Sequence, residues 1–499
     1  MIRKIIVIVL VTSSLLVAAQ DHQDALRLSQ SINSGTARFV SMGGAFGALG
    51  ADFTSLSYNP AGLGVYRASE FTVTTSLKNK EVSTLYLNQV THDFRTRLLF
   101  DNIGFVSSFK TTKQEEKGLV FLNIGLGYNR LFDFFDETSA YGANTSSSIM
   151  NHFASVANGN NWFNLTSNDD YNPYRSGSAP WDAIMAWNTF LIDTIPGSIN
   201  EYSRALNNGE GVYQDQSLST IGGLGEFTFS FATNFSNKFF IGATLGIQDL
   251  YYKQIQYYSE EAFENNTPLP IGYKFNNLDY KQTLTIEGSG LNLKIGAIYK
   301  PIPMFRAGIA IHTPTFYSIS ETYRASMESV FSDFNEFATT PINFYDYRIQ
   351  SPFKAIGSLA FTFREIGLLS FDYEYIDYST ARFIKGGDGY RFKQENSEIG
   401  DLYTTTYNLK AGGEVWLKYL ALRAGYAYYG SPFEGNVNMK SSAINVLSAG
   451  FGFRIDNLFI DWAYQRYYYS DKYSLYINSP EVERDIKENK FMLTLGFKF

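Results

Sequence analysis

Four basic residues are the best candidates for binding chemistry in this sequence. They occur in segments where apolar and polar residues alternate, a pattern that places the polar side chains of a strand on one face. Lysine and arginine hold carboxylates through charge-assisted hydrogen bonds, so each is a possible partner for the carboxylate of a ligand. The alternative for each is a structural ion pair with an acidic residue such as Asp372, Glu374 or Asp461. The candidates are Lys294, Arg306, Arg423 and Arg454.

Catalytic chemistry has little support in the sequence. There is no Gly-x-Ser-x-Gly, His-Glu-x-x-His or phosphate-loop motif. The four histidines, His22, His92, His152 and His312, are scattered along the chain. We therefore expect no enzymatic activity, no cofactor and no bound metal. The acidic clusters at 168–170 and 259–261 are expected to be solvated loop tips, with calcium binding as the alternative.

The composition is unusual in its aromatic content. Of 499 residues, 17% are aromatic, with 36 Tyr and 42 Phe, and 18% are charged. Transmembrane β-barrels use aromatic residues in the lipid-facing band and in the girdles at its edges. A mean hydropathy of −0.17 excludes a helical membrane protein, and a net charge of −7 argues against a nucleic-acid partner. The absence of cysteine excludes a lipoprotein anchor, a Cys-ligated metal site and a disulfide framework.

The last residues of the sequence predict a barrel strand. Apolar residues stand at every second position from Phe491 to Phe499, separated by small or polar residues. Strands that face lipid must close into a barrel, because every backbone group there needs a hydrogen-bond partner. The pattern recurs along the chain and predicts an all-β fold, a transmembrane antiparallel β-barrel of about 14 strands. The alternative is the edge of an ordinary sheet. The expected strands are 69–90, 99–112, 117–131, 220–234, 238–256, 279–300, 303–322, 343–364, 366–380, 401–417, 419–431, 442–455, 457–473 and 486–499.

Short and long connections alternate between these strands, as they do in outer-membrane barrels. Short turns are expected at 236–237, 301–302, 364–365, 417–418 and 456–457. The longest connection, 132–219, is predicted to be an extracellular loop that contains a short helix within 180–192. Two roles are open for it: a lid that captures ligand, or a folded cap that shields the barrel.

The N-terminal region divides into two parts. Residues 1–19 have the basic start, apolar stretch and small-residue end of a signal peptide. Residues 20–66 contain Met42-Gly-Gly-Ala-Phe46 and Asn59-Pro-Ala-Gly-Leu63, where Pro60 pushes Asn59 out of the helical region. This compact, turn-rich segment is predicted to be a plug inside a barrel formed by residues 67–499. The alternative is a short linker.

These two motifs, together with the strand count and the terminal Phe499, resemble the FadL/TodX family of outer-membrane transporters of hydrophobic compounds. The resemblance implies a monomeric barrel of 14 strands in the bacterial outer membrane, with its lumen blocked by an N-terminal hatch. It implies passive uptake of long-chain fatty acids or aromatic hydrocarbons, and release sideways through a gap where the third strand kinks. Phe499 would be the signal read by the barrel-assembly machinery. By position, the hatch-motif residues are Gly43, Gly44, Ala45, Asn59, Pro60 and Ala61.

The resemblance leaves the ligand and the gap open. The third strand contains Gly125 and Gly127, which would permit a bulge at the gap. The resemblance makes long-chain fatty acids the predicted ligand, and a dry apolar pocket with a lateral exit would spare a hydrophobic ligand from crossing water. The alternatives are an aromatic hydrocarbon, haem with His312 as the lumen candidate for its iron, a general porin and a surface-binding barrel. The longest loop follows the third strand, whereas loops after later strands usually form the family's capture groove.

Overall fold

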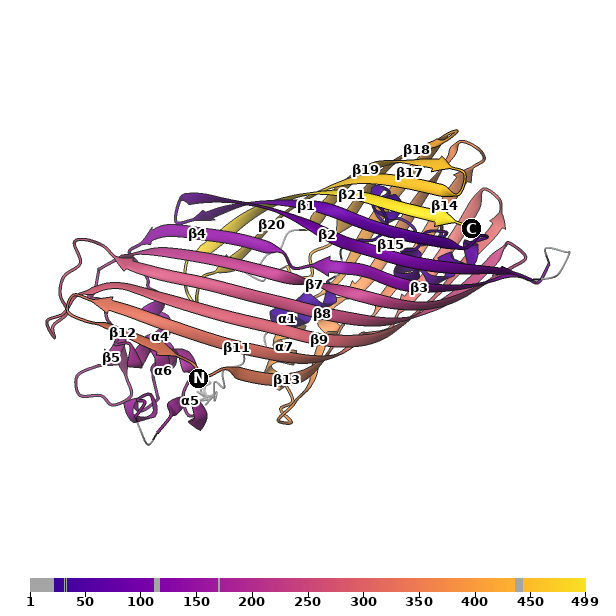
Figure 1. The fold of residues 1–499 in the computed structure, drawn as a ribbon. Helices are drawn as coiled ribbons and strands as arrows, with labels where there is room; N and C mark the ends of the chain where they lie inside the picture. The colour runs from indigo at the N-terminus through magenta and orange to yellow at the C-terminus, as the bar shows by residue number, and fades with distance from the viewer. Residues whose placement is uncertain (1–21, 31, 33, 112–116, 169–170, 436–442) are drawn as a thin grey trace, which may run out of the picture.

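A computed structural model describes residues 22–30, 32, 34–111, 117–168, 171–435 and 443–499. The expected signal peptide, 1–19, lies outside the described residues, as do Asp169 and Asp170 of one expected loop tip. The described residues form one antiparallel sheet that closes on itself as a barrel of 14 strands (Figure 1). The predicted all-β barrel and its number of strands are therefore confirmed.

Several barrel strands are interrupted and carry two labels. The pairs β3 and β4, β10 and β11, β13 and β14, and β15 and β16 each belong to one barrel strand, and β12 is a hairpin arm paired with β11. The strands are β1 (Glu70–Tyr86), β2 (Gln89–Lys110), β3 (Leu119–Asp133), β4 (Asp136–Asn144), β7 (Val212–Phe235), β8 (Phe239–Ala262), β9 (Phe275–Ile302), β10 (Phe305–His312), β11 (Phe316–Phe331), β12 (Asn335–Thr339), β13 (Asn343–Gln350), β14 (Lys354–Phe363), β15 (Gly367–Asp377), β16 (Arg382–Gly386), β17 (Thr405–Leu417), β18 (Leu420–Tyr429), β19 (Ile444–Ile455), β20 (Leu458–Ser474) and β21 (Glu481–Lys498).

The predicted last strand closes the barrel. β21 pairs with β1 in a register that runs from Glu70↔Lys498 to Leu85↔Glu483. Its apolar residues face outward, where Phe491 is 53% exposed, and Thr494 faces inward and is fully buried. The same alternation in the other strands gives the outer wall a continuous belt of exposed Phe, Leu and Ile side chains. Such a belt is what a lipid-facing surface requires.

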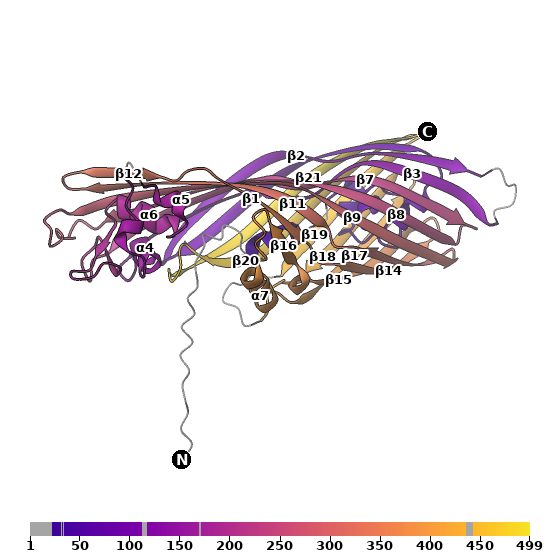
Figure 2. The ribbon, with the colours of Figure 1, turned by 90° about the horizontal axis from the view of Figure 1, so that it is seen from below.

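The two ends of the barrel differ. At one end, here called the short-turn end, brief turns such as Ser236-Asn237 and Asp456-Asn457 join the strands. At the other, the long-loop end, β7, β8, β9 and β11 extend well beyond the short strands of the opposite wall (Figures 1 and 2). Residues 91–98, expected between strands, belong to β2, because Leu87 and Asn88 form a tight turn with φ of 46° and 64°.

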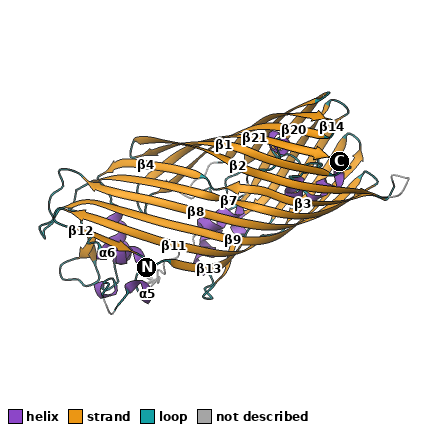
Figure 3. Cartoon of the chain, viewed as in Figure 1, coloured by secondary structure: helices purple, strands orange, loops and turns teal. Residues whose placement is uncertain are grey.

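Helices stabilise the extension of these long strands. The segment 145–211, here called the cap, packs against the inner face of the extended sheet and buries Phe153, Ile184 and Met327 completely. Figure 3 places its helices together at the long-loop end. The helix expected within 180–192 is α6. The cap elements are α4 (Ile149–Ala157), η2 (Trp162–Asn164), α5 (Pro173–Ser176), α6 (Trp181–Asn188), β5 (Ile192–Thr194) and β6 (Tyr202–Arg204).

The N-terminal segment lies inside the barrel. Its four short helices are α1 (His22–Ser29), α2 (Ala37–Ser41), α3 (Ser55–Tyr58) and η1 (Pro60–Val65). Near the rim of the long-loop end, α1 meets η3 (Tyr378–Thr380) and α7 (Lys393–Leu402) in one apolar cluster. Nowhere in the described part of the chain does a helix have the length and apolar character needed to cross a membrane.

Candidate functional site

The hatch motifs sit directly against glycines of the barrel wall. Gly43 and Gly44 adopt positive φ of 65° and 74°, and a Cβ on Gly43 would lie 2.8 Å from the carbonyl oxygen of Tyr426. On the wall, a Cβ on Gly242 would overlap the carbonyl group of Pro60, and one on Gly296 would overlap the side chain of Asn59. Because these wall positions lack side chains, the backbone of the hatch packs onto the strands themselves.

Asn59 holds the hatch turn together. Its Oδ1 accepts a hydrogen bond from the backbone N–H of Ala61 at 3.1 Å, which caps η1, and its Nδ2 donates to the Gly47 carbonyl at 2.5 Å. Its φ of −132° and ψ of 102° are extended, as expected for a residue before proline. One side chain therefore joins the two halves of the hatch, the Gly-Gly-Ala segment and the Asn-Pro-Ala turn.

Charged residues of two neighbouring wall strands, β15 and β17, anchor the hatch. Asp372 accepts hydrogen bonds from the backbone N–H groups of Phe46 and Gly47 at 2.8 and 2.9 Å. On the neighbouring strand, Glu414 accepts hydrogen bonds from Nε and Nη2 of Arg38 at 3.0 and 3.1 Å. Since each contact joins residues more than 300 positions apart, the hatch is fixed to the barrel by tertiary contacts rather than by its own sequence.

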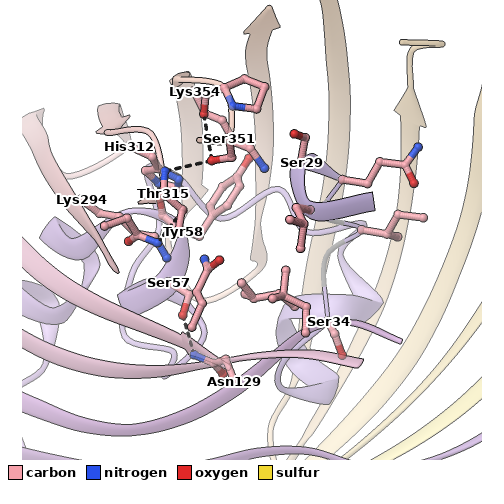
Figure 4. A pocket seen from close by; sticks show the side chains of 18 of the residues that line it. Ser29, Ser34, Ser57, Tyr58, Asn129, Lys294, His312, Thr315, Ser351 and Lys354 are labelled. Carbon is pink, nitrogen blue, oxygen red and sulfur yellow. Dashed lines mark hydrogen bonds between the residues drawn. The ribbon is translucent and has the colours of Figure 1, made fainter. Parts of the chain in front are cut away.

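A small chamber, here called the inner chamber, lies between the hatch and the wall (Figure 4). It has a volume of about 80 Å³. The hatch contributes Ser57 and Tyr58, and the wall contributes mostly polar side chains. The labelled wall residues of Figure 4 are Asn129, Lys294, His312, Thr315, Ser351 and Lys354. A chamber of this size and polarity fits the head group of a ligand better than a long apolar chain.

Basic side chains outnumber acidic ones around the inner chamber. Lys294 is paired with buried Glu226. Lys410 is paired with buried Glu374 at 2.9 Å and lies 3.2 Å from the hydroxyl of Tyr58. Lys354 lines the chamber with Lys294 and adds a third ammonium group to this cluster. Three cations thus surround two carboxylates, which leaves the cluster with a net positive charge and favours an anionic head group.

The structure divides the four basic candidates among three places. Lys294 alone lines the inner chamber. Arg306 donates to the Leu49 carbonyl of the hatch at 2.7 Å. Arg423 and Arg454 lie near the short-turn end and share Asp461. His312, the candidate for haem iron, has its Nε2 2.8 Å from the carbonyl oxygen of Tyr58. Among the described residues, no group of three or more His, Asp or Glu could hold a metal ion.

A larger cavity of about 390 Å³, here called the outer chamber, lies toward the long-loop end. It shares Gln30, Ile32, Ser34 and Leu131 with the inner chamber, so the two spaces are neighbours beside the end of α1. Its wall includes the segment 130–136 and several tyrosines of β20. Together the two chambers give a ligand a polar inner end and a mixed, aromatic outer end.

The barrel wall has a seam behind the outer chamber. The backbone ladder between β2 and β3 starts at Asn102↔Asn129, and β4 pairs with β7. Over 89–101, side chains rather than a described backbone ladder join β2 to β4. Asp93 accepts hydrogen bonds from the backbone N–H and the hydroxyl of Ser139 at 2.7 and 2.8 Å, and Arg95 pairs with Glu137. Side-chain contacts open more easily than a continuous ladder.

The seam begins where β3 loses its regular pairing. The register of β3 against β7 shifts between Arg130 and Phe132. Gly125 and Gly127 lie earlier, in the regularly paired part of β3 opposite Val106 and Gly104. A Cβ on Gly125 would overlap the side chain of Leu56 on the hatch. The two glycines therefore make room for the hatch in this structure.

Sequence analysis missed two prolines that shape the inner chamber. Pro314 separates β10 from β11 and Pro352 separates β13 from β14, within segments that were expected to be continuous strands. The breaks face each other, because the Thr315 N–H donates to the Ser351 hydroxyl at 2.9 Å. A proline inside a strand pattern is a signal for such a break, since proline cannot donate a ladder hydrogen bond. Nothing comparable in the sequence marked Lys354 and Lys410 as residues at or near the inner chamber.

The sequence and the structure were compared with those of known proteins. No protein-family model and no curated protein matches the sequence. The structure is similar to that of a Pseudomonas aeruginosa FadL homologue, at 12% identity and a TM-score of 0.54, over 94% of this chain and 100% of that one. It is also similar to the P. putida toluene transporter TodX, at 11% identity and a TM-score of 0.52, over 94% and 99%. The expected resemblance is thus confirmed at the level of the fold: this chain has the barrel-and-hatch fold of the FadL and TodX proteins.

Proposed function

We propose that this chain is a bacterial outer-membrane protein that passively transports hydrophobic small molecules carrying an anionic group, with long-chain fatty acids as the main class. The observation that carries the proposal is the inner chamber, which Lys294 and Lys354 line together with the hatch residue Tyr58, while Lys410 lies 3.2 Å from the Tyr58 hydroxyl. The carboxylate of a fatty acid would sit among these ammonium groups. Its alkyl chain would extend into the outer chamber, which shares lining residues with the inner one.

We place the exit at the seam between β2 and β4. The segment 130–136 lines the outer chamber on the inside of this seam. On the outside, Phe94 and Leu98 of β2 are 69% and 72% exposed, which provides an apolar surface beside the seam. A hydrophobic ligand that leaves here stays out of water, so its apolar surface is never rehydrated. Residues Asn59, Pro60 and Ala61 would act as the hatch element that moves.

Uptake of labelled oleate by cells without their own fatty-acid transporter tests the ligand class. The Lys354→Met protein is expected to take up oleate less well at low concentration, by about tenfold, because a charge-assisted contact to the carboxylate is lost. Glu374 keeps Lys410 as its partner, so this substitution does not leave it as an unpaired buried carboxylate. Toluene, which has no charge, should enter equally well with either protein.

Lys385→Met is the matched control, since Lys385 is an exposed lysine of β16 outside both chambers. It should leave oleate uptake unchanged. Equal oleate uptake by the wild-type and Lys354→Met proteins, both folded by heat-modifiable gel mobility, would contradict a carboxylate site in the inner chamber. No uptake of either compound by the wild-type barrel would contradict the transport proposal itself.

A cross-link across the seam tests the exit. The natural chain has no cysteine, so Asp93→Cys combined with Ser139→Cys can be bridged selectively by a short, reducible thiol cross-linker. The bridged protein is expected to lose most of its uptake, and reduction of the linker should restore it. The same double variant capped with N-ethylmaleimide at both cysteines is the control. Full uptake with the bridge intact would rule out exit between β2 and β4.

An aromatic hydrocarbon is the second candidate ligand. The outer chamber is lined by many rings, among them Phe132, Phe134, Tyr252 and Tyr467. TodX, which shares the fold, is a toluene transporter. Saturable toluene uptake that competes with oleate would favour a chamber that serves both classes. The cations of the inner chamber make the acid the preferred ligand in this proposal.

A further inference from the structure

A second charged cavity lies on the other side of the hatch, near the short-turn end. It has a volume of about 270 Å³. The hatch contributes Thr36, Arg38 and Asp52 to it, and the wall contributes the starts of β1, β18 and β20 and the ends of β17, β19 and β21. We call this space the lower cavity. Neither the fold comparison nor the transport proposal gives it a role.

Three arginines share two carboxylates in the lower cavity. Glu414 accepts hydrogen bonds from Arg38 at 3.0 and 3.1 Å and from Nε of Arg423 at 2.5 Å. Asp461 accepts from Arg423 at 2.7 Å and from Arg454 at 3.1 and 3.2 Å. Both carboxylates are therefore saturated by donors, whereas the arginines bring one positive charge more than the two acids neutralise.

One buried donor of this network lacks a partner. Nη2 of Arg423 has none within the described part of the chain, and the side chain is 0% exposed. A buried guanidinium N–H without an acceptor costs free energy that a bound anion would recover. The other acids of the lining do not provide that acceptor. Asp52 accepts a hydrogen bond from the hydroxyl of Thr36, and Glu70 accepts one from the hydroxyl of Tyr66.

The lower cavity is separate from the inner chamber. A hydrogen-bonded group of Thr36, Asp52 and Thr54 stands between them, with the Thr36 N–H donating to Thr54 Oγ1 at 2.8 Å and the Thr54 N–H donating to Asp52 Oδ1 at 3.0 Å. Thr54 lines the inner chamber, and Thr36 and Asp52 line the lower cavity.

Solvent reaches the lower cavity from the short-turn end. The side chain of Arg454 is 37% exposed, and that of Lys498 is 46% exposed. Arg454 lies just before the turn at 456–457, and the Lys498 N–H donates to the Asn457 carbonyl of that turn at 2.8 Å. An anion can therefore approach Arg454 from this side of the barrel and reach the deeper Arg423 without passing the hatch.

We propose that the lower cavity is a binding site for the carboxylate or phosphate group of a small molecule that enters from the short-turn end. The oxyanion would bridge Arg454 at the mouth and Nη2 of Arg423 at the back. In the cell this end faces the periplasm if the proposed location is right. Binding itself does not depend on which ligand crosses the inner chamber.

Calorimetric titration of the folded protein in non-ionic detergent at pH 7, with inorganic phosphate and with acetate, tests the site. The wild-type protein should bind at least one of the two saturably. Arg454→Gln should weaken that binding by about tenfold, because a charge-assisted contact is removed. Arg423→Lys should weaken it similarly, since lysine keeps the charge beside Glu414 and Asp461 but lacks the second planar donor. Phosphate bound far more tightly than acetate would identify a phosphate site, and the reverse a carboxylate site.

Lys472→Gln is the matched control. Its side chain is also 37% exposed and paired with carboxylates, but it lies at the long-loop end. It should bind like the wild-type protein. An absence of saturable binding, or the same loss in Lys472→Gln as in Arg454→Gln, would overturn the proposal. Oleate uptake measured on the same variants keeps the two proposals apart, because Arg454→Gln should leave uptake unchanged.

Discussion

The Gly296→Val protein is expected to fold as a barrel but to lose its seated hatch and conduct ions through the lumen. Gly296 faces inward on β9, where a Cβ would overlap the Asn59 side chain and lie 3.3 Å from the Ala61 nitrogen. Two further methyl groups cannot be placed without moving the Asn-Pro-Ala turn. Overpacking of about 1–3 kcal/mol would shift the hatch from seated to displaced by about tenfold to a hundredfold.

Conductance in planar lipid bilayers measures this effect directly. Gly357→Val is the control, because Gly357 is also a strand glycine of the barrel, yet a Cβ there would meet nothing within 4 Å. Cells that carry the Gly296→Val protein should also become sensitive to a large hydrophilic antibiotic that the outer membrane normally excludes. If both variants stayed equally closed, the contact between Gly296 and Asn59 would not be what keeps the hatch in place.

The second large effect is expected at the ion pair between Lys294 and Glu226. Lys294→Met should destabilise the barrel by about 3–5 kcal/mol, because it leaves a buried carboxylate without its cation. The pair is almost completely buried, with side-chain exposures of 5% and 0%. The double variant Lys294→Met, Glu226→Met should recover most of the lost stability, since two apolar residues of similar size leave no charge unpaired.

Unfolding by urea, followed by tryptophan fluorescence in lipid vesicles, measures these differences. Lys472→Met is the comparison, because it breaks a solvent-exposed pair whose removal should change stability little. Oleate uptake by the double variant adds a functional readout: it should remain reduced although the fold is restored. A double variant as unstable as the single one would show that Lys294 does not act through Glu226.

The sequence was sufficient to predict the barrel because that information is local. Alternation along single strands identified the outward face of β21 and the number of strands. Pro60 restricts the backbone of the residue before it, so the extended conformation of Asn59 could be expected from two adjacent residues. The helix of the cap was predictable for the same reason, since its apolar pattern lies within one short segment.

The tertiary structure alone decided what the charged residues do. Lys294 meets Glu226 across 68 positions, and Arg38 meets Glu414 across 376. No periodicity within a strand specifies which residue of another strand, or of the hatch, stands opposite a given charge. Sequence reasoning therefore grouped four cations by their inward face, and the structure divided them between an inner chamber, a hatch contact and a lower cavity. The seam between β2 and β4 could not be predicted for the same reason, because strand pairing depends on contacts between residues that are far apart in the sequence.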